Sequence, residues 1–207
     1  PDFIFHLAAQ SLVSVSFKNP RETWETNLLG TLNILEILRD VKKNTIVVII
    51  TSDKAYKNVE KQEGYKETDI LAGIDPYSAS KSSVEILIKS YFDCFIKFKK
   101  NIKIGIARAG NVIGGGDWSK DRLIPDCVRS WSINKTVTIR NPNSTRPWQH
   151  VLEAVWAYIL FGSKLKNDKK LNGQAFNFGP NTTKDYSVLK LLITMKKHWS
   201  NIEYKIK

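Results

Sequence analysis

Two short apolar runs constrain the fold of this chain more than any other feature. They are Thr45–Ile50 and Ile102–Ala107, rich in β-branched residues and without the polar alternation of a half-exposed strand. Such runs are typical of parallel strands that are covered on both faces. Between them, helical spacing of apolar residues follows Asp75-Pro76 and continues to about Lys97. This strand–helix–strand order implies right-handed crossovers and predicts an α/β fold with a doubly wound parallel sheet.

The same alternation extends in both directions along the chain. A strand is expected over Phe3–Leu7, and a helix from Trp24 to Val41. After Gly110 the segments become shorter and richer in loop-forming residues. We expect a smaller second layer there, with helices near 124–133 and 151–163 and strands near 137–140 and 175–178.

The net charge is the one unusual feature of the composition, at +12 from 32 basic and 20 acidic residues. Most of the basic residues are dispersed lysines, and no zinc-finger spacing, helix-turn-helix or RNP-type motif accompanies them. We therefore expect no nucleic-acid partner. The longest clean apolar run, Ile46–Ile50, has five residues, against about 20 for a membrane span. With no signal peptide visible, we expect a cytoplasmic protein without a membrane partner.

Cysteine and histidine give no sign of a metal site. Cys94 and Cys127 are isolated, which disfavours CxxC redox chemistry and zinc binding and fits a reducing compartment. His6, His150 and His198 lack the spacing of metal ligands. The prediction is that the protein uses no metal.

Tyr77 and Lys81 carry the clearest chemical signal. They stand four residues apart near a helix start, and therefore on one helix face. A nearby ammonium stabilises phenolate and lowers a tyrosine pKa from about 10, so the phenol can act as a base. A YxxxK pattern also occurs by chance, but here Thr51–Lys54 follows a predicted buried strand, and chemistry gathers at the carboxyl ends of such strands. The alternative for Thr51–Lys54 is a strand cap with a surface ion pair.

At these residues the chain resembles the extended short-chain dehydrogenase/reductase family, in its nucleotide-sugar branch. The similarity runs from His6 to about Pro180. Besides Thr51–Lys54 and Tyr77–Lys81, the matching segments are Gly64–Asp69, Asp75–Ser78, Ala107–Trp118, Asp121-Arg122, Arg140–Pro142 and Thr145–Glu153.

The resemblance implies NAD as the cofactor and a Rossmann-like domain to bind it. Residues 1–110 would form that domain in part, and residues 111–207 mainly a substrate-binding region, with the chain free to cross back between them. The implied NAD contacts are Leu7, Ala8, Ala9, Gln10, Asn27, Thr51, Tyr77 and Lys81. The family's Gly-rich GxxGxxG turn is absent, so we expect an N-terminally truncated sequence that binds NAD poorly or folds poorly alone.

The resemblance also implies a hydro-lyase reaction on a nucleotide sugar. Tyr77 would take the proton of the C4 hydroxyl, Ser52 would hydrogen-bond that oxygen, and Lys81 would hold the nicotinamide ribose. Asp53 would then protonate the departing C6 hydroxyl while Lys54 removes the C5 proton. Most relatives have Asp-Glu at this pair. Lysine at the second position resembles the CDP-glucose enzymes and implies CDP-glucose as substrate, in dideoxysugar and O-antigen synthesis.

Substrate contacts are implied in the second half of the chain. Asn111, Arg122 and Arg146 match residues that contact the nucleotide and diphosphate, for which guanidinium groups supply bidentate contacts. Solvated surface arginines are the alternative for both Arg122 and Arg146. The two long helices match the pair that forms a homodimer in the family, although burial within one copy would produce the same apolar pattern.

Two other functional classes remain open at this point. One is a nucleotide-sugar 4-epimerase or another dehydratase of the same superfamily, although an epimerase needs no acid/base pair such as Asp53 and Lys54. The other is a non-catalytic module that binds a nucleotide sugar or a polyanion, which the intact Ser52, Asp53, Tyr77 and Lys81 disfavour.

Overall fold

The chain forms two compact units. A computed structural model describes residues 1–61, 63–180, 187–199 and 202–207. The first unit, here called the sheet unit, combines Pro1–Ala109 with Ala154–Phe178. The second, the small unit, combines Gly110–Glu153 with Gly179–Lys207. The chain thus crosses back into the sheet unit, while the roles expected for residues 1–110 and 111–207 stay predictions.

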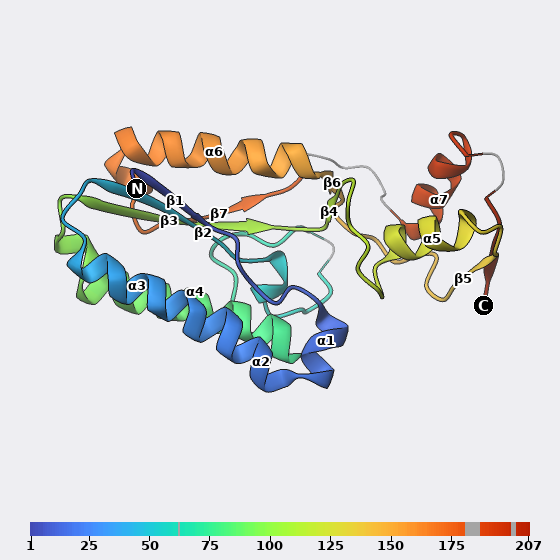
Figure 1. The fold of residues 1–207 in the computed structure, drawn as a ribbon, viewed down its shortest axis with the longest axis horizontal. Helices are drawn as coiled ribbons and strands as arrows, with labels where there is room; N and C mark the ends of the chain where they lie inside the picture. The colour runs from blue at the N-terminus through green and yellow to red at the C-terminus, as the bar shows by residue number, and fades with distance from the viewer. Residues whose placement is uncertain (62, 181–186, 200–201) are drawn as a thin grey trace. The chain divides into compact units, whose positions relative to one another are not determined.

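The sheet unit is built on four parallel strands in the order β1-β2-β3-β7 (Figure 1). Their bounds are Phe3–His6, Thr45–Ile50, Ile102–Ala109 and Ala175–Phe178. Strands β2 and β3 pair from Thr45 with Ile102 to Ile50 with Ala107. These are the two apolar runs of the sequence, and both are almost wholly buried.

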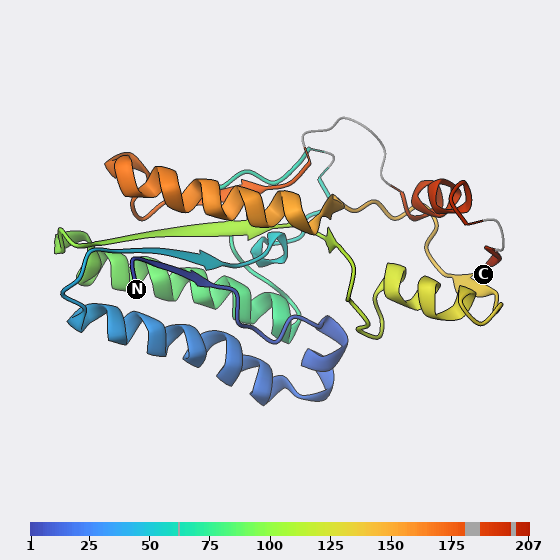
Figure 2. The same ribbon diagram turned by 45° about the horizontal axis from the view of Figure 1, so that its top comes forward.

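Helices cover both faces of this sheet (Figures 1 and 2). The helices of this unit are α1 (Val13–Lys18), α2 (Pro20–Trp24), α3 (Gly30–Asp40), α4 (Pro76–Cys94) and α6 (Val151–Asn167), with short turns η1 (Glu25–Leu29), η2 (Asp53–Ala55), η3 (Ile96–Phe98) and η4 (Lys169–Leu171). Helices α3 and α4 lie on one face and α6 on the other. The predicted doubly wound, Rossmann-like α/β fold is confirmed.

Strand β3 shows how alternate residues serve the two faces. Ile104 and Ile106 join the core formed with Leu35 and Leu38 of α3, all of them buried. Burial of each such side chain contributes about 1.5–3 kcal/mol. Gly105 points to the opposite face, where an added Cβ would lie 2.4 Å from Cζ of Phe161 in α6. A side chain at position 105 would therefore push α6 off the sheet.

The first long helix differs from its prediction. One helix was expected from Trp24 to Val41, but a π-helical turn, Glu25–Leu29, joins α2 to α3. Such a turn adds a residue within a helix without ending it, and it is frequent at functional sites. Asn27 lies in this turn and is buried.

The small unit has its own core. Its elements are β4 (Val112–Ile113), α5 (Leu123–Trp131), β5 (Val137–Ile139), β6 (Gln149–His150), α7 (Val188–Lys196) and β8 (Tyr204–Ile206). Strands β4 and β6 pair in parallel, as do β5 and β8. Trp131 and Leu192 are fully buried in this core together with the Cys127 thiol. Cys94 and Cys127 are both free.

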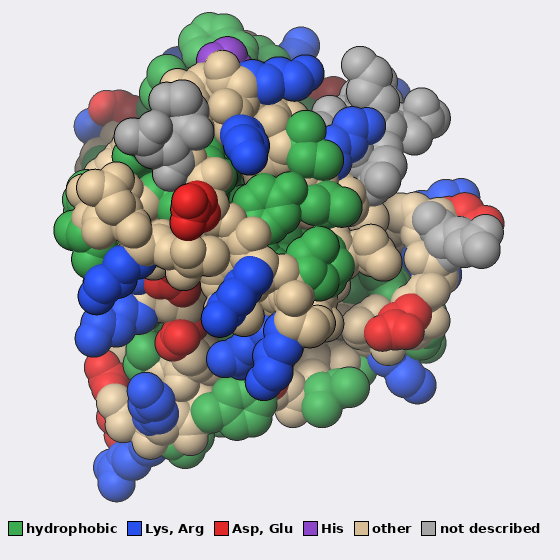
Figure 3. Space-filling model, turned by 90° about the vertical axis from the view of Figure 1, so that its right-hand side faces the viewer, with side chains coloured by type: hydrophobic (Ala, Val, Ile, Leu, Met, Phe, Trp, Pro, Cys, Tyr) green, Lys and Arg blue, Asp and Glu red, His purple; other side chains and the backbone are tan. Residues whose placement is uncertain are grey.

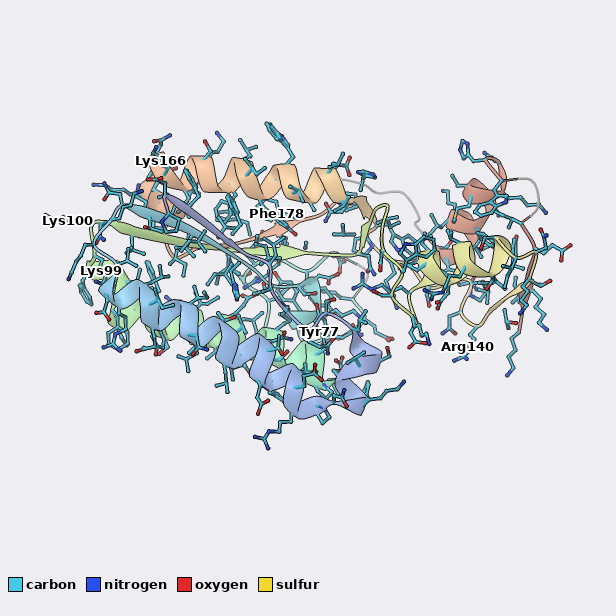
Figure 4. The ribbon with its side chains drawn as sticks, viewed as in Figure 1. Tyr77, Lys99, Lys100, Arg140, Lys166 and Phe178 are labelled. Atoms are coloured by element: carbon cyan, nitrogen blue, oxygen red, sulfur yellow. The ribbon has the colours of Figure 1, made fainter. Side chains whose placement is uncertain are left out.

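Charged side chains are mixed with side chains of other kinds on one face of the molecule. On the face drawn in Figure 3, lysine and arginine side chains are interspersed with hydrophobic and acidic ones. In the sheet unit, Lys99, Lys100 and Lys166 lie at the end opposite to Tyr77 (Figure 4). Among the described residues, no helix combines the length and apolar character needed to cross a membrane.

Candidate active site

Residues after β2 form the first part of the candidate site. The backbone N–H of Thr51 still donates to the carbonyl of Ala107 at 2.9 Å, so the strand pairing holds this residue in place. The buried Ser52 then caps η2, because its Oγ accepts from the N–H of Lys54 at 3.2 Å. Ser52 Oγ also donates to Asp53 Oδ1 at 3.1 Å. Asp53 is half-buried and Lys54 is exposed at this turn.

The start of α4 supplies Tyr77 and Lys81, both of which are buried (Figure 4). Asp75 caps the helix by accepting from the N–H of Ser78 at 3.0 Å, and Pro76 occupies its first turn, as the sequence predicts. Gly73 lies against this turn so closely that an added Cβ would be 2.1 Å from the carbonyl carbon of Ser78. Glycine is therefore required beside the helix that carries Tyr77.

Ser82 ties η2 to α4. Its hydroxyl donates to the carbonyl of Ala55 at 2.7 Å and accepts from the N–H of Gly73 at 2.9 Å. Ser82 follows Lys81 directly, and Ala55 follows Lys54. This hydroxyl therefore holds the turn that carries Ser52, Asp53 and Lys54 against the helix that carries the Tyr77–Lys81 pair.

The ammonium of Lys81 is buried beside the end of β2. Its Nζ donates to the carbonyl of Ile50 at 3.3 Å. Burial lowers the pKa of Lys81 to about 8, and the charge of Glu85 acts in the opposite direction. His6, at the end of β1, is close enough that Lys81 adds to the lowering of the His6 pKa that burial causes. A lysine has three donors, so this cation suits a ligand with several hydroxyl groups.

Asn27 connects the loop after β1 with α4. Its Oδ1 accepts from the N–H of Gln10 at 2.8 Å, and its Nδ2 donates to Ser80 Oγ at 2.9 Å and to the carbonyl of Gln10 at 3.1 Å. Leu7 is 52% exposed in the same loop, and Ala8 is exposed as well. The predicted cofactor-binding residues of the sheet unit thus lie together at the carboxyl ends of β1 and β2.

The three predicted substrate-binding residues belong to the small unit. Arg122 donates to Asp117 at 3.0 Å, and Arg146 donates to the carbonyl of Thr145 at 2.7 Å. The carbonyl of Asn111 accepts from the N–H of Gln149 at 3.0 Å. Their contact with a substrate stays a prediction. Within the described part of the chain, no group of three or more His, Cys, Asp or Glu side chains forms a metal site.

Comparison with known proteins decides the family. A family model described as GDP-mannose 4,6 dehydratase matches residues 1–205. The chain belongs to this family. The resemblance found in the sequence to nucleotide-sugar dehydratases is thereby confirmed.

Proteins similar to this GDP-mannose 4,6-dehydratase family chain in sequence or in fold are named for different nucleotide sugars. It is 45% identical over 184 residues to CDP-glucose 4,6-dehydratase of Salmonella typhimurium, covering 87% of this chain and 51% of that protein. UDP-glucuronic acid 4-epimerase from Bacillus cereus, solved with UDP-glucuronic acid and NAD, has a TM-score of 0.84 at 22% identity, covering 99% of this chain and 62% of that one. UDP-glucose 4-epimerase from Thermotoga maritima, solved with UDP-glucose, has a TM-score of 0.82 at 25% identity, covering 100% and 64%. The chain thus spans about half the length of the curated relative.

Sequence reasoning missed a buried polar group beside the site of this dehydratase-family chain. Glu85 lies one helical turn beyond Lys81 and forms a buried ion pair with Arg108 of β3. The phenol of Tyr56 contacts the same guanidinium. The one available signal was the four-residue spacing from Lys81 to Glu85, which places the two side chains on one helix face.

Replacement of Lys81 by methionine is expected to raise the free energy of unfolding at neutral pH. The folded protein holds Lys81 at a pKa of about 8, against an ordinary value of 10.5, so the buried ammonium opposes folding below pH 8. The difference between these two pKa values corresponds to a loss of about 3 kcal/mol in the free energy of unfolding. The protein regains this stability as the pH rises from about 8 toward 10.5. Urea unfolding at about pH 7 and about pH 10 measures this. Equal pH dependence in both proteins would contradict it.

Proposed function

We propose that this chain is the catalytic part of an NAD-dependent hydro-lyase that converts CDP-glucose to CDP-4-keto-6-deoxyglucose. The observation that carries the proposal is the junction made by Ser82, which packs the turn Ser52–Lys54 against the helix start bearing Tyr77 and Lys81. A dehydratase needs a base that assists oxidation at C4 and, beside it, an acid/base pair that eliminates water. The 45% identity to a CDP-glucose 4,6-dehydratase supports the choice of substrate.

The residues around β1 and β2 fit NAD. In the loop Leu7–Gln10, Leu7 and Ala8 are exposed, and the small side chains of Ala8 and Ala9 let a ligand approach the backbone. Asn27 holds that loop, and Thr51 lies at the adjacent strand end. The buried Lys81 ammonium has donors to offer to ribose hydroxyl groups. When bound, NAD would supply the chemistry for removal of a hydride from C4 and for its later return to C6.

The chain's own groups then handle the protons. Tyr77 takes the proton of the C4 hydroxyl, with Lys81 four residues along the same face to stabilise the phenolate. Ser52 orients the C4 oxygen. A ketone at C4 acidifies the C5 proton. Lys54, as the neutral amine, removes that proton while Asp53, as the carboxylic acid, gives its proton to the C6 hydroxyl, which leaves as water. In the small unit, Asn111, Arg122 and Arg146 would bind the nucleotide and diphosphate.

The deciding experiment supplies the full-length protein and NAD with CDP-glucose, UDP-glucose or dTDP-glucose. The product is detected through the alkaline absorbance of a 4-keto-6-deoxy sugar. We expect product from CDP-glucose in clear preference to the others. Turnover of another donor alone would assign a different dehydratase. Inversion at C4 without loss of water would assign an epimerase, and binding without turnover would leave a nucleotide-sugar-binding module.

We also propose that two copies associate through the long helices of the sheet unit. Ile37 of α3 and Ile86 of α4 are 61% and 60% exposed, which leaves apolar surface on both helices. The resemblance further implies a cytoplasmic enzyme whose product enters dideoxysugar synthesis. These three points stay predictions.

A further inference from the structure

A buried ion pair links α4 to the central strand. The guanidinium of Arg108 in β3 donates through Nε to Glu85 Oε1 at 2.8 Å and Oε2 at 2.9 Å. The two side chains are only 5% and 2% exposed. Neither group is therefore open to a substrate, and any effect on catalysis must pass through neighbouring residues.

The pair reaches both ends of the turn that carries Ser52, Asp53 and Lys54. Before the turn, Thr51 Oγ1 donates to Glu85 Oε1 at 2.7 Å. After it, Arg108 Nη1 donates to the phenol oxygen of Tyr56, and the guanidinium carbon lies 4.8 Å from the centre of that ring. The turn is thus anchored on either side to one charged pair.

Tyr56 extends the same network to β7, the edge strand that pairs with β3. Its phenol donates to Asn177 Oδ1 of β7 at 2.7 Å, and Asn177 Nδ2 donates to the carbonyl of Tyr65 at 2.8 Å. The backbone N–H of Asn177 donates to Glu67 Oε1 at 2.8 Å. The Tyr56 hydroxyl therefore joins the ion pair to Asn177 of β7, and Arg108 Nη1 donates directly to the carbonyl of Glu67 in the loop that follows the turn, at 3.1 Å.

We propose that Tyr56, with the Glu85–Arg108 pair, is a positioning residue that holds Asp53 and Lys54 in place for the elimination step. The inference rests on the proposed dehydratase function. Elimination needs an acid and a base at fixed places on either side of the C5–C6 bond, and a displacement of about 1 Å can cost about 100-fold in rate. Tyr77 and Lys81 are carried by the backbone of α4, so oxidation at C4 depends less on the phenol of Tyr56 than elimination does.

The test compares Tyr56→Phe with Tyr91→Phe, a matched control on α4 whose phenol contacts the exposed Glu36. Hydrogen exchange over residues 51–57 reports the order of the turn, and kinetic isotope effects with substrate deuterated at C4 or C5 report the slow step. We expect faster exchange in Tyr56→Phe, turnover lowered about 10- to 100-fold with KM nearly unchanged, and a larger C5 isotope effect. Tyr91→Phe should match wild type in all of these.

Asn177→Ala provides a second variant, because it removes the acceptor of the Tyr56 phenol and leaves the ion pair intact. It should give the same pattern as Tyr56→Phe. Lower thermal stability with unchanged isotope effects and exchange would show a merely structural role and overturn the proposal. The two proposals can fail independently. If the wild-type protein shows no dehydratase activity, the proposed function fails. Faster hydrogen exchange over residues 51–57 in both variants would then still support the positioning of the turn by Tyr56.

Discussion

Replacement of Tyr77 by phenylalanine should lower turnover of CDP-glucose by about 10²- to 10⁴-fold, the usual contribution of a positioned general base. The substitution keeps the buried ring and removes only the hydroxyl, so α4 and its Asp75 cap should remain intact. Initial rates of 4-keto product formation measure the effect. Tyr91→Phe, on the same helix, is the control and should retain wild-type turnover.

The stage at which the reaction stops separates Tyr77 from the neighbouring turn. Tyr77→Phe should block oxidation at C4, so no loss of deuterium from C4 would be detected in a single turnover. Lys54→Ala should retain that oxidation and fail at removal of the C5 proton. Near-normal turnover in Tyr77→Phe, with the protein folded, would contradict the role assigned to this phenol.

The sheet could be predicted from the sequence because covered parallel strands leave an unmistakable pattern. Thr45–Ile50 is a strand with the predicted bounds, since every position is apolar or β-branched and lies between two helix layers. The π-helical turn at Glu25–Leu29 could not be predicted in this way. Apolar spacing alone tolerates one inserted residue. The family resemblance pointed to Asn27, but its contacts with Gln10 and Ser80 are seen only in the structure.

The candidate site shows the same difference between what local spacing predicts and what only the fold brings together. Tyr77 and Lys81 were found because their spacing is local and a helix converts it directly into proximity. The partners of Arg108 come from three other segments, with Glu85 on α4, Tyr56 after the turn and Glu67 in the following loop. Their meeting depends on the β2–β3 register and on the docking of α4, which no spacing in the sequence encodes.

The second large expected effect is on stability. Arg108→Ala should reduce the free energy of unfolding by about 3–5 kcal/mol, because it leaves the Glu85 carboxylate buried without its cation. Against a typical total of about 5–15 kcal/mol, this is a large fraction. Urea unfolding followed by far-ultraviolet circular dichroism measures the change. Arg21→Ala is the matched control, since the Arg21–Glu25 pair is exposed and its loss should leave the urea midpoint nearly unchanged.

A double variant separates the stability of this pair from its effect on the turn. Glu85→Met with Arg108→Met removes both charges and fills the space with apolar groups, which often restores much of the stability lost by breaking such a pair. Thr51 and Tyr56 would still lose their charged partners. We therefore expect the double variant to unfold at a higher urea concentration than Arg108→Ala but to remain slow in elimination. Full recovery of turnover along with stability would show that the charges act only on folding, because apolar packing cannot orient the turn through hydrogen bonds.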